Sequence, residues 1–512
     1  MFPTGSDFES EFTLENSAVP LPEEPPFHVL LLGDWGGSSI RKSLNERRPV
    51  VIDRDNFDDV LKKLNVTLGL DLNGDGNQIL NLQFAELDDF HPDNLFRQIS
   101  LFSDLRDVRR RLANPDSFES AADEVRSWFD TTNEVVEPQT ETQFEIDNAP
   151  PLDSNNLLDM ILTKPSESKI STKPQNIDNS ELGRFVSKII SPYLIKIDEN
   201  EQSKLIAAVD NIISELMRTI LHHPKFQALE SAWRGLYFLV RRLETHVDLK
   251  VFILDLSKDE LMDNLKSVNS LSDSFLYRRL ITESIETLGS EAFAAVGGNY
   301  TFGANVDDIA LLLRIAKLAY AANAPFISYI QPEMFGIKDF SEIIESSKFK
   351  VLEESNASKL WSALRAAPEA NYLALSPMRI LSRMPYGEKT DSTETFSFEE
   401  FTDNVNYANY LWMNPCFAGI LLLAQSYRQY GWDMERALRH DIENLPLHIY
   451  QEGGETKTKP CAEVVLTESM LENILEAGLM PLIAFRDSEK VRIARFQPVS
   501  LASTNLSGKW NL

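Results

Sequence analysis

Cysteine, histidine and basic residues are scarce in this chain of 512 residues. The two cysteines, Cys416 and Cys461, cannot supply a disulfide framework or a zinc cluster. Seven histidines leave few candidates for general acid–base catalysis. Fifty Lys and Arg stand against 78 Asp and Glu, a net charge of −28, which argues against a partner that is a nucleic acid or an anionic membrane surface.

Long apolar runs are also missing. The densest runs, residues 29–32 and 417–424, fall well short of the roughly 20 residues that span a membrane. The first residues show no basic start followed by an apolar core, so no secretory signal and no membrane insertion are predicted. Together with the low cysteine content, this predicts a cytoplasmic location. What the chain does have is 43% hydrophobic residues, enough for two or three cores.

The N-terminal part mixes strand and helix signals. Residues 1–26 are acidic and lack Lys and Arg, so we expect a flexible lead-in. Residues 27–32 form an apolar run that predicts a buried strand ending in a glycine turn. Together with the elements that follow, this strand predicts a small α+β domain over residues 27–132. The further elements are helices at 56–64, 93–99, 101–112 and 121–129 and a hairpin at 66–72 and 79–87.

The C-terminal part, residues 179–512, starts with two long helices and continues with alternating strands and helices. Ser257 and Glu260 form a capping box that opens one of the later helices. The alternation implies a largely parallel sheet covered by helices, so we predict an α/β fold class for the chain. The predicted helices are 201–221, 226–243, 307–322 and 415–430, and the predicted strands are 249–254, 293–296, 326–330, 372–375, 464–466 and 482–485.

Residues 133–178 between these parts have the composition of a linker, because they are acidic, rich in Pro, Ser, Thr and Asn, and mostly without periodicity. One amphipathic segment interrupts the linker, and we expect it to be a short helix. It could bind in a groove of a partner or dock back onto its own domain, and the sequence leaves both open. The segment consists of Leu157, Leu158, Asp159, Met160, Ile161 and Leu162.

No motif specifies a catalytic, cofactor or metal site. Residues 71–76 fit the start of a calcium loop, but Leu82 stands where the bidentate Glu is needed. The adjacent His222 and His223 diverge by about 100° on a helix, so they cannot share one metal. We therefore expect no enzyme activity, no cofactor and no metal.

A cluster of four arginines stands out in this acidic protein. All four fall in one predicted helix, where they form either a solvated face or a docking face for an acidic partner, and both readings stay open. The four are Arg106, Arg109, Arg110 and Arg111.

Ordered motifs run through both parts of the chain. In the C-terminal part they are LHHPKFQALESAWRGL (221–236), DLKV (248–251), AANAPFI (321–327), MFG (334–336), RMPYG (383–387) and YLWMN (410–414). These resemble the large subunit of the type VI secretion contractile sheath, over roughly residues 155–500. The N-terminal motifs LGDW (32–35), RRPVVIDRDNFDDV (47–60) and DDFHPD (88–93) resemble the small subunit of that sheath.

The resemblance implies a structural protein in which both sheath subunits are fused and packed around an inner tube. The partners it implies are other sheath protomers, the inner tube protein, baseplate proteins and an AAA+ disassembly ATPase. In the large subunit that ATPase binds a short helix near the N-terminus, and residues 157–162 are similar to this helix. Typical large subunits continue past the region matching residues 495–499 into a further C-terminal domain, which we expect this chain to lack. The chain could therefore be a specialised or non-contractile element of the sheath. The alternative is a non-polymerising, sheath-derived module that captures sheath subunits or the ATPase.

Overall fold

A computed structural model describes residues 24–72, 79–130, 202–287, 290–335, 356–402, 407–503 and 505–511. We call residues 24–130 the N-terminal segment and residues 202–511 the C-terminal segment. The N-terminal segment contains β1 (Phe27–Gly33), β2 (Val50–Ile52), α1 (Phe57–Leu64), β3 (Val66–Asp71), β4 (Ile79–Phe84), α2 (Pro92–Gln98), α3 (Ser100–Ala113) and α4 (Phe118–Asp130).

The C-terminal segment begins with the two long helices α6 (Gln202–Leu221) and α7 (Pro224–Arg242). Its further helices are α8 (Lys258–Ser267), α9 (Phe275–Tyr277), α10 (Val306–Ala322), α11 (Asn356–Ala366), α12 (Cys416–Tyr430) and α13 (Glu468–Glu476). Its strands are β5 (Leu249–Asp255), β6 (Phe293–Phe302), β7 (Phe326–Ile330), β8 (Leu373–Ser376), β9 (Ile380–Leu381), β10 (Trp412–Met413), β11 (Asp441–Ile442), β12 (His448–Glu452), β13 (Glu455–Lys459), β14 (Leu482–Ala484) and β15 (Val491–Ile493).

A six-stranded sheet in the order β2-β5-β1-β6-β7-β8 joins the two segments. Strand β1 pairs in parallel with β5 along its whole length and with β6 on its other side. Only β2 is antiparallel, at the edge beside β5. The five parallel strands have the order of a flavodoxin-like doubly wound sheet, counted from β1. Thus the N-terminal segment supplies the strand around which the sheet of the C-terminal segment is built.

The apolar run of β1 explains this position, because all seven of its residues are buried. A strand without a polar face needs cover on both sides, and parallel sheets provide it. Helix α12 packs on β1, β6 and β7, and α10 packs on β6 and β7. Residues of both segments belong to one continuous hydrophobic core.

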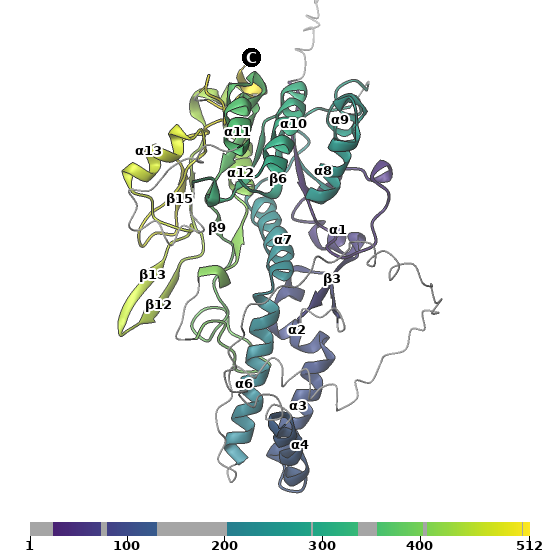
Figure 1. Ribbon diagram of the computed structural model, residues 1–512, viewed down its shortest axis with the longest axis vertical. Helices are drawn as coiled ribbons and strands as arrows, with labels where there is room; N and C mark the ends of the chain where they lie inside the picture. The colour runs from purple at the N-terminus through teal and green to yellow at the C-terminus, as the bar shows by residue number, and fades with distance from the viewer. Residues whose placement is uncertain are drawn as a thin grey trace, which may run out of the picture.

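At the end of the molecule away from the sheet, α3 and α4 lie beside α6 (Figure 1). Above this three-helix bundle, α7 leads to the sheet, and the β12–β13 hairpin projects at the lower left of the view. Among the helices that the structure describes, none combines the length and the apolar character needed to cross a bilayer.

Most sequence-based elements are confirmed, including the β3–β4 hairpin, Pro92 at the start of α2 and the capping box of α8. The small domain expected over residues 27–132 stays a prediction. Its strand β1 lies between two strands of the C-terminal segment in one sheet. The strand predicted at 464–466 is wrong, because these residues are irregular. The β12–β13 hairpin was missed. Its two strands alternate weakly between apolar and polar residues, so they carry little strand signal.

Candidate functional site: the seam between the two segments

The seam is the surface on which the N-terminal and C-terminal segments contact each other. Its first part lies where β1 and β5 end, the edge at which open α/β sheets usually bind ligands. Here Asp255, the last residue of β5, accepts hydrogen bonds from the backbone N–H groups of Trp35 (2.8 Å) and Gly36 (3.2 Å). The chain that leaves β1 is thereby tied to its neighbouring strand.

Two arginines of the N-terminal segment fill the same edge. The Arg41 guanidinium lies 3.0 Å from Asp255 and 3.1 Å from Glu260, and it also pairs with Asp34. Arg47 pairs with Glu260 at 2.6 Å and donates to the carbonyl of Asp255 at 2.9 Å. Burial alone would raise the pKa of Glu260, but Arg47, the backbone N–H of Ser257 and Arg41 together outweigh it, and the pKa falls to about 2. The edge is therefore closed by ion pairs between the segments.

Aromatic side chains make up the second part of the seam. The indole N–H of Trp233 on α7 donates to the carbonyl of Trp35 (3.1 Å), and the two rings meet edge to face. Phe57 of α1 also meets Trp233 edge to face, with ring centroids 5.6 Å apart. Gly235 lets α7 approach α12, because a Cβ there would lie 2.4 Å from the Phe417 ring.

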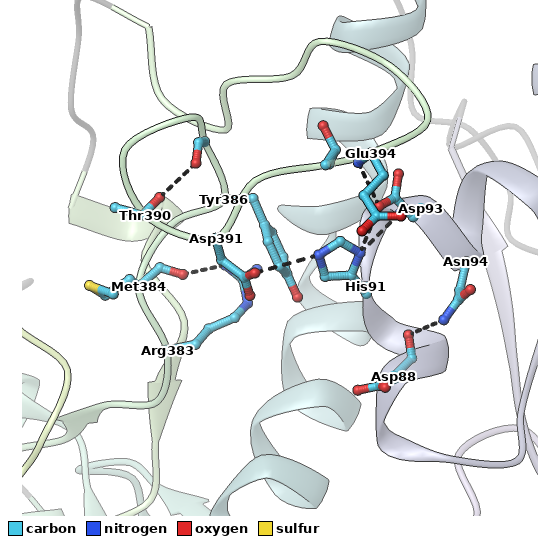
Figure 2. Close-up of polar contacts among 12 residues, drawn as sticks. Asp88, His91, Asp93, Asn94, Arg383, Met384, Tyr386, Thr390, Asp391 and Glu394 are labelled. Atoms are coloured by element: carbon cyan, nitrogen blue, oxygen red, sulfur yellow. Dashed lines mark hydrogen bonds and ion pairs between the residues drawn. The ribbon is translucent and has the colours of Figure 1, made fainter.

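The third part joins the start of α2 to the loop at residues 383–395, and Figure 2 shows these two stretches of the chain facing each other. The Asp93 carboxylate accepts from the backbone N–H groups of Glu394 (2.8 Å) and Thr395 (2.9 Å) and from the Thr395 hydroxyl. Burial would raise the pKa of Asp93, but these hydrogen bonds lower it below its usual value. His91 packs edge to face on Tyr386, at 4.9 Å between ring centroids.

Behind Tyr386 lies a buried cluster of charged side chains, which we call the Arg383 cluster. Arg383 contacts Glu230 of α7 at 2.8 Å and Glu400 at 2.7 Å, and its guanidinium stacks 4.1 Å from the centroid of the Tyr386 ring. Arg234 pairs with Glu230 at 2.6 Å and donates to the Tyr386 hydroxyl at 2.8 Å. Two arginines thus balance two glutamates.

Burial and pairing oppose each other in the Arg383 cluster. Glu230 is completely buried, and Glu400 is 2% exposed. Burial would raise the pKa of Glu400, but Arg383, His222 and the backbone N–H of Tyr386 lower it to about 2. Burial would likewise lower the pKa of Arg383, and the two glutamates raise it well above its usual value. Glu400 and Arg383 are therefore both ionised near neutral pH.

The arginines singled out in the sequence lie on α3 in the three-helix bundle. Arg109 forms an ion pair with Asp210 of α6, and Arg111 pairs with Asp107 and, at 2.7 Å, with Glu124 of α4. Arg110 pairs with Asp107, and Arg106 is exposed. Two of the four thus help to hold the bundle together. The segment at residues 157–162 lies outside the described residues.

The charged residues of the seam were missed in the sequence, although one signal was available. Glu230 falls on the apolar face of α7, in line with Phe226 and Trp233, where a charge requires a partner. His222, the residue after α6, lies 3.4 Å from Glu400 and so belongs to the same cluster. Within the described ranges, no three His, Cys, Asp or Glu side chains converge as metal ligands.

Replacing Arg383 by Met should destabilise the protein by about 3–5 kcal/mol, because Glu230 and Glu400 would then be buried without their shared partner. Urea unfolding measures this loss. The matched control is Arg54→Met, since Arg54 is 71% exposed and its loss should cost no more than about 1 kcal/mol. Adding E230Q and E400Q to R383M should recover part of the loss. Equal effects of R383M and R54M would contradict this assignment.

Acid should weaken the Arg383 cluster through Glu400. Its pKa falls from 4.5 to about 2 on folding, so its stabilising contribution is complete above pH 4.5 and disappears as the pH falls towards 2. The depression corresponds to about 3 kcal/mol. Urea midpoints measured between about pH 5 and about pH 3 should drop more steeply for the parent chain than for E400Q. Parallel slopes would show that Glu400 has an ordinary pKa.

The motifs at the seam agree with comparisons to known proteins. Residues 203–499, more than half of the chain, match the family described as "EvpB/VC_A0108, tail sheath N-terminal domain". Residues 11–143 match the family described as "Type VI secretion system, VipA, VC_A0107 or Hcp2". The seam described above therefore lies between a segment of each family.

Two curated relatives come from Pseudomonas aeruginosa. The type VI secretion system sheath protein TssC1 is 32% identical over 291 residues, which cover 56% of this chain and 58% of TssC1. The sheath protein TssB1 is 30% identical over 95 residues, which cover 17% of this chain and 55% of TssB1. The chain thus spans little more than half the length of either relative. On the strength of the first match, this chain belongs to the EvpB/VC_A0108 tail sheath family, and a segment that matches the VipA family model is joined to it in the same polypeptide.

Proposed function

We propose that this chain is a structural subunit of a type VI secretion tail sheath, in which the small-subunit and large-subunit parts act as one protomer. One observation carries this proposal. Strand β1 belongs to the VipA-type match, yet it is an inner strand of the sheet of the VipB-type segment. Such a chain supplies both parts of a sheath unit in a fixed one-to-one ratio.

The proposed role is mechanical rather than catalytic. Both relatives carry the name of sheath proteins. At the edge of the sheet where α/β enzymes bind their substrates, Arg41 and Arg47 are held by carboxylates of the other segment. The buried charges of the Arg383 cluster are likewise balanced against each other, which suits a rigid joint.

The partners follow from the same proposal. They are other sheath protomers, an inner tube protein, baseplate proteins and an AAA+ disassembly ATPase, all in the cytoplasm. On α3, Arg106, Arg109 and Arg110 are exposed, but Arg109 is paired with Asp210 of α6, so Arg106 and Arg110 are the residues we propose for docking an acidic partner. Arg109 and Arg111 serve the bundle instead.

The segment from Leu157 to Leu162 is the proposed contact for the ATPase. A peptide of residues 150–170 should retain the cognate ATPase in a pull-down, because an apolar helix face on an acidic tether suits a groove. The control peptide carries L158D and I161D, which remove the apolar face and keep the length. If both peptides retain equal amounts of ATPase, or neither retains any at high micromolar concentration, this contact is wrong.

Electron microscopy of the purified chain tests the proposed function. We expect tubules or rings, and R106E with R110E should reduce them if α3 docks onto a neighbour. The thermal stability of that double variant should match the parent, since both side chains are exposed. Arg54→Glu, another exposed position, is the control that should leave assembly unchanged. Single dispersed copies at high protein concentration would contradict a sheath subunit.

A further inference from the structure

The N-terminal segment shares its core with the C-terminal segment. Strand β1 has partners only in β5 and β6 among the described strands, Phe96 of α2 stacks on Phe396 at 4.7 Å, and α3 packs on α6. Phe90 likewise packs edge to face on Phe226 of α7. A segment built in this way needs a C-terminal segment to sit on, and nothing in these contacts requires that segment to be its own.

The covalent connection between the segments is long. It runs from Asp130, the last residue of α4, to Gln202, the first residue of α6, across residues 131–201. A chain of 71 residues spans at most about 240 Å when extended. Both of its anchor helices belong to the three-helix bundle at one end of the molecule (Figure 1). The connection is therefore long enough to reach the seam of a neighbouring copy.

We propose that the seam accepts the N-terminal segment of a second copy of this chain, so that neighbouring copies exchange their segments. The contacts across an exchanged seam are the same as those within one chain, and the exchange therefore costs little. A tether of this length gives a chain's own N-terminal segment an effective concentration on the order of millimolar at most. The N-terminal segment of a copy packed alongside is present at a similar local concentration, so it competes for the same seam.

The position of β1 inside the sheet determines the stage at which segments can exchange. Strand β1 is bonded to a neighbour on both sides, so its release opens the sheet. Exchange therefore takes place while the chains fold or assemble, and mixing of folded copies is slow. This inference rests on the proposed function in one respect, because assembly into a sheath is what packs copies side by side.

The test uses two differently tagged full-length chains that are co-expressed and then oxidised. One chain carries Asp93→Cys and the other Thr395→Cys, two positions whose side chains touch across the seam. Neither chain can close this disulfide by itself. Exchange should give a disulfide-linked band with the mass of two chains and both tags. The native Cys416 and Cys461 are buried and remain in every variant.

A second pair guards against loss of the Asp93 contacts. Val51 on the edge strand β2 lies directly opposite Phe252 on β5, and Val51 is 40% exposed, so V51C and F252C form an accessible cross-strand pair. Each pair has a control in which both cysteines sit on one chain, which shows whether the disulfide forms. R54C with T395C is the negative control, because Arg54 is 71% exposed and its guanidinium faces Asp55.

The outcomes separate the two proposals. A two-tag dimer with either pair supports exchange. Oxidation of the single-chain controls without any two-tag dimer shows that each N-terminal segment stays on its own chain, and this overturns the exchange. If neither single-chain control oxidises, the seam itself is wrong and the exchange falls with it. Tubules seen without the two-tag dimer would leave the sheath proposal intact and refute only the exchange.

Discussion

The double pairing of β1 is the constraint on which the rest of this structure depends. The strand is buried throughout and contributes hydrogen bonds to β5 on one side and β6 on the other. Without it, the sheet of the C-terminal segment would lose its connection between these two strands. Burial of the seven residues also places the chain that follows, so Trp35, Arg41 and Arg47 reach the ends of β1 and β5.

The charged clusters of the seam act differently from this apolar strand. Ion pairs buried as deeply as those of Arg383 add little net stability, because desolvation of the charges offsets their attraction. A misplaced partner, however, leaves an unpaired buried charge, which is strongly unfavourable. The pairs of Arg41 and Arg47 with Asp255 and Glu260 therefore fix where the N-terminal segment sits. The Arg383 cluster lies wholly in the C-terminal segment and fixes Tyr386, on which His91 packs. The apolar contacts supply most of the binding energy.

Local order was largely predictable from the sequence, and the joint between the segments was not. The strand at 27–32, the hairpin, the long helices and the capping box each depend on residues close in sequence, and all are confirmed. The pairing of β1 with β5 depends on residues more than 200 positions apart, and an apolar run in the sequence does not indicate which strands will pair with it. Glu230 showed that a partner was needed, but neither Arg383 nor Glu400 could be picked out among so many charged residues. The short β9, β10 and β11 strands are set by tertiary contacts and carry almost no local signal.

The central claim is that two segments of different families form one folding unit, and cleavage between them tests it most directly. A protease site inserted between residues 150 and 151 allows the purified chain to be cut without touching any described residue. The account predicts that both fragments stay together on size exclusion in native buffer and unfold in a single urea transition. Fragments that separate in native buffer, or that unfold in two independent transitions, would contradict it.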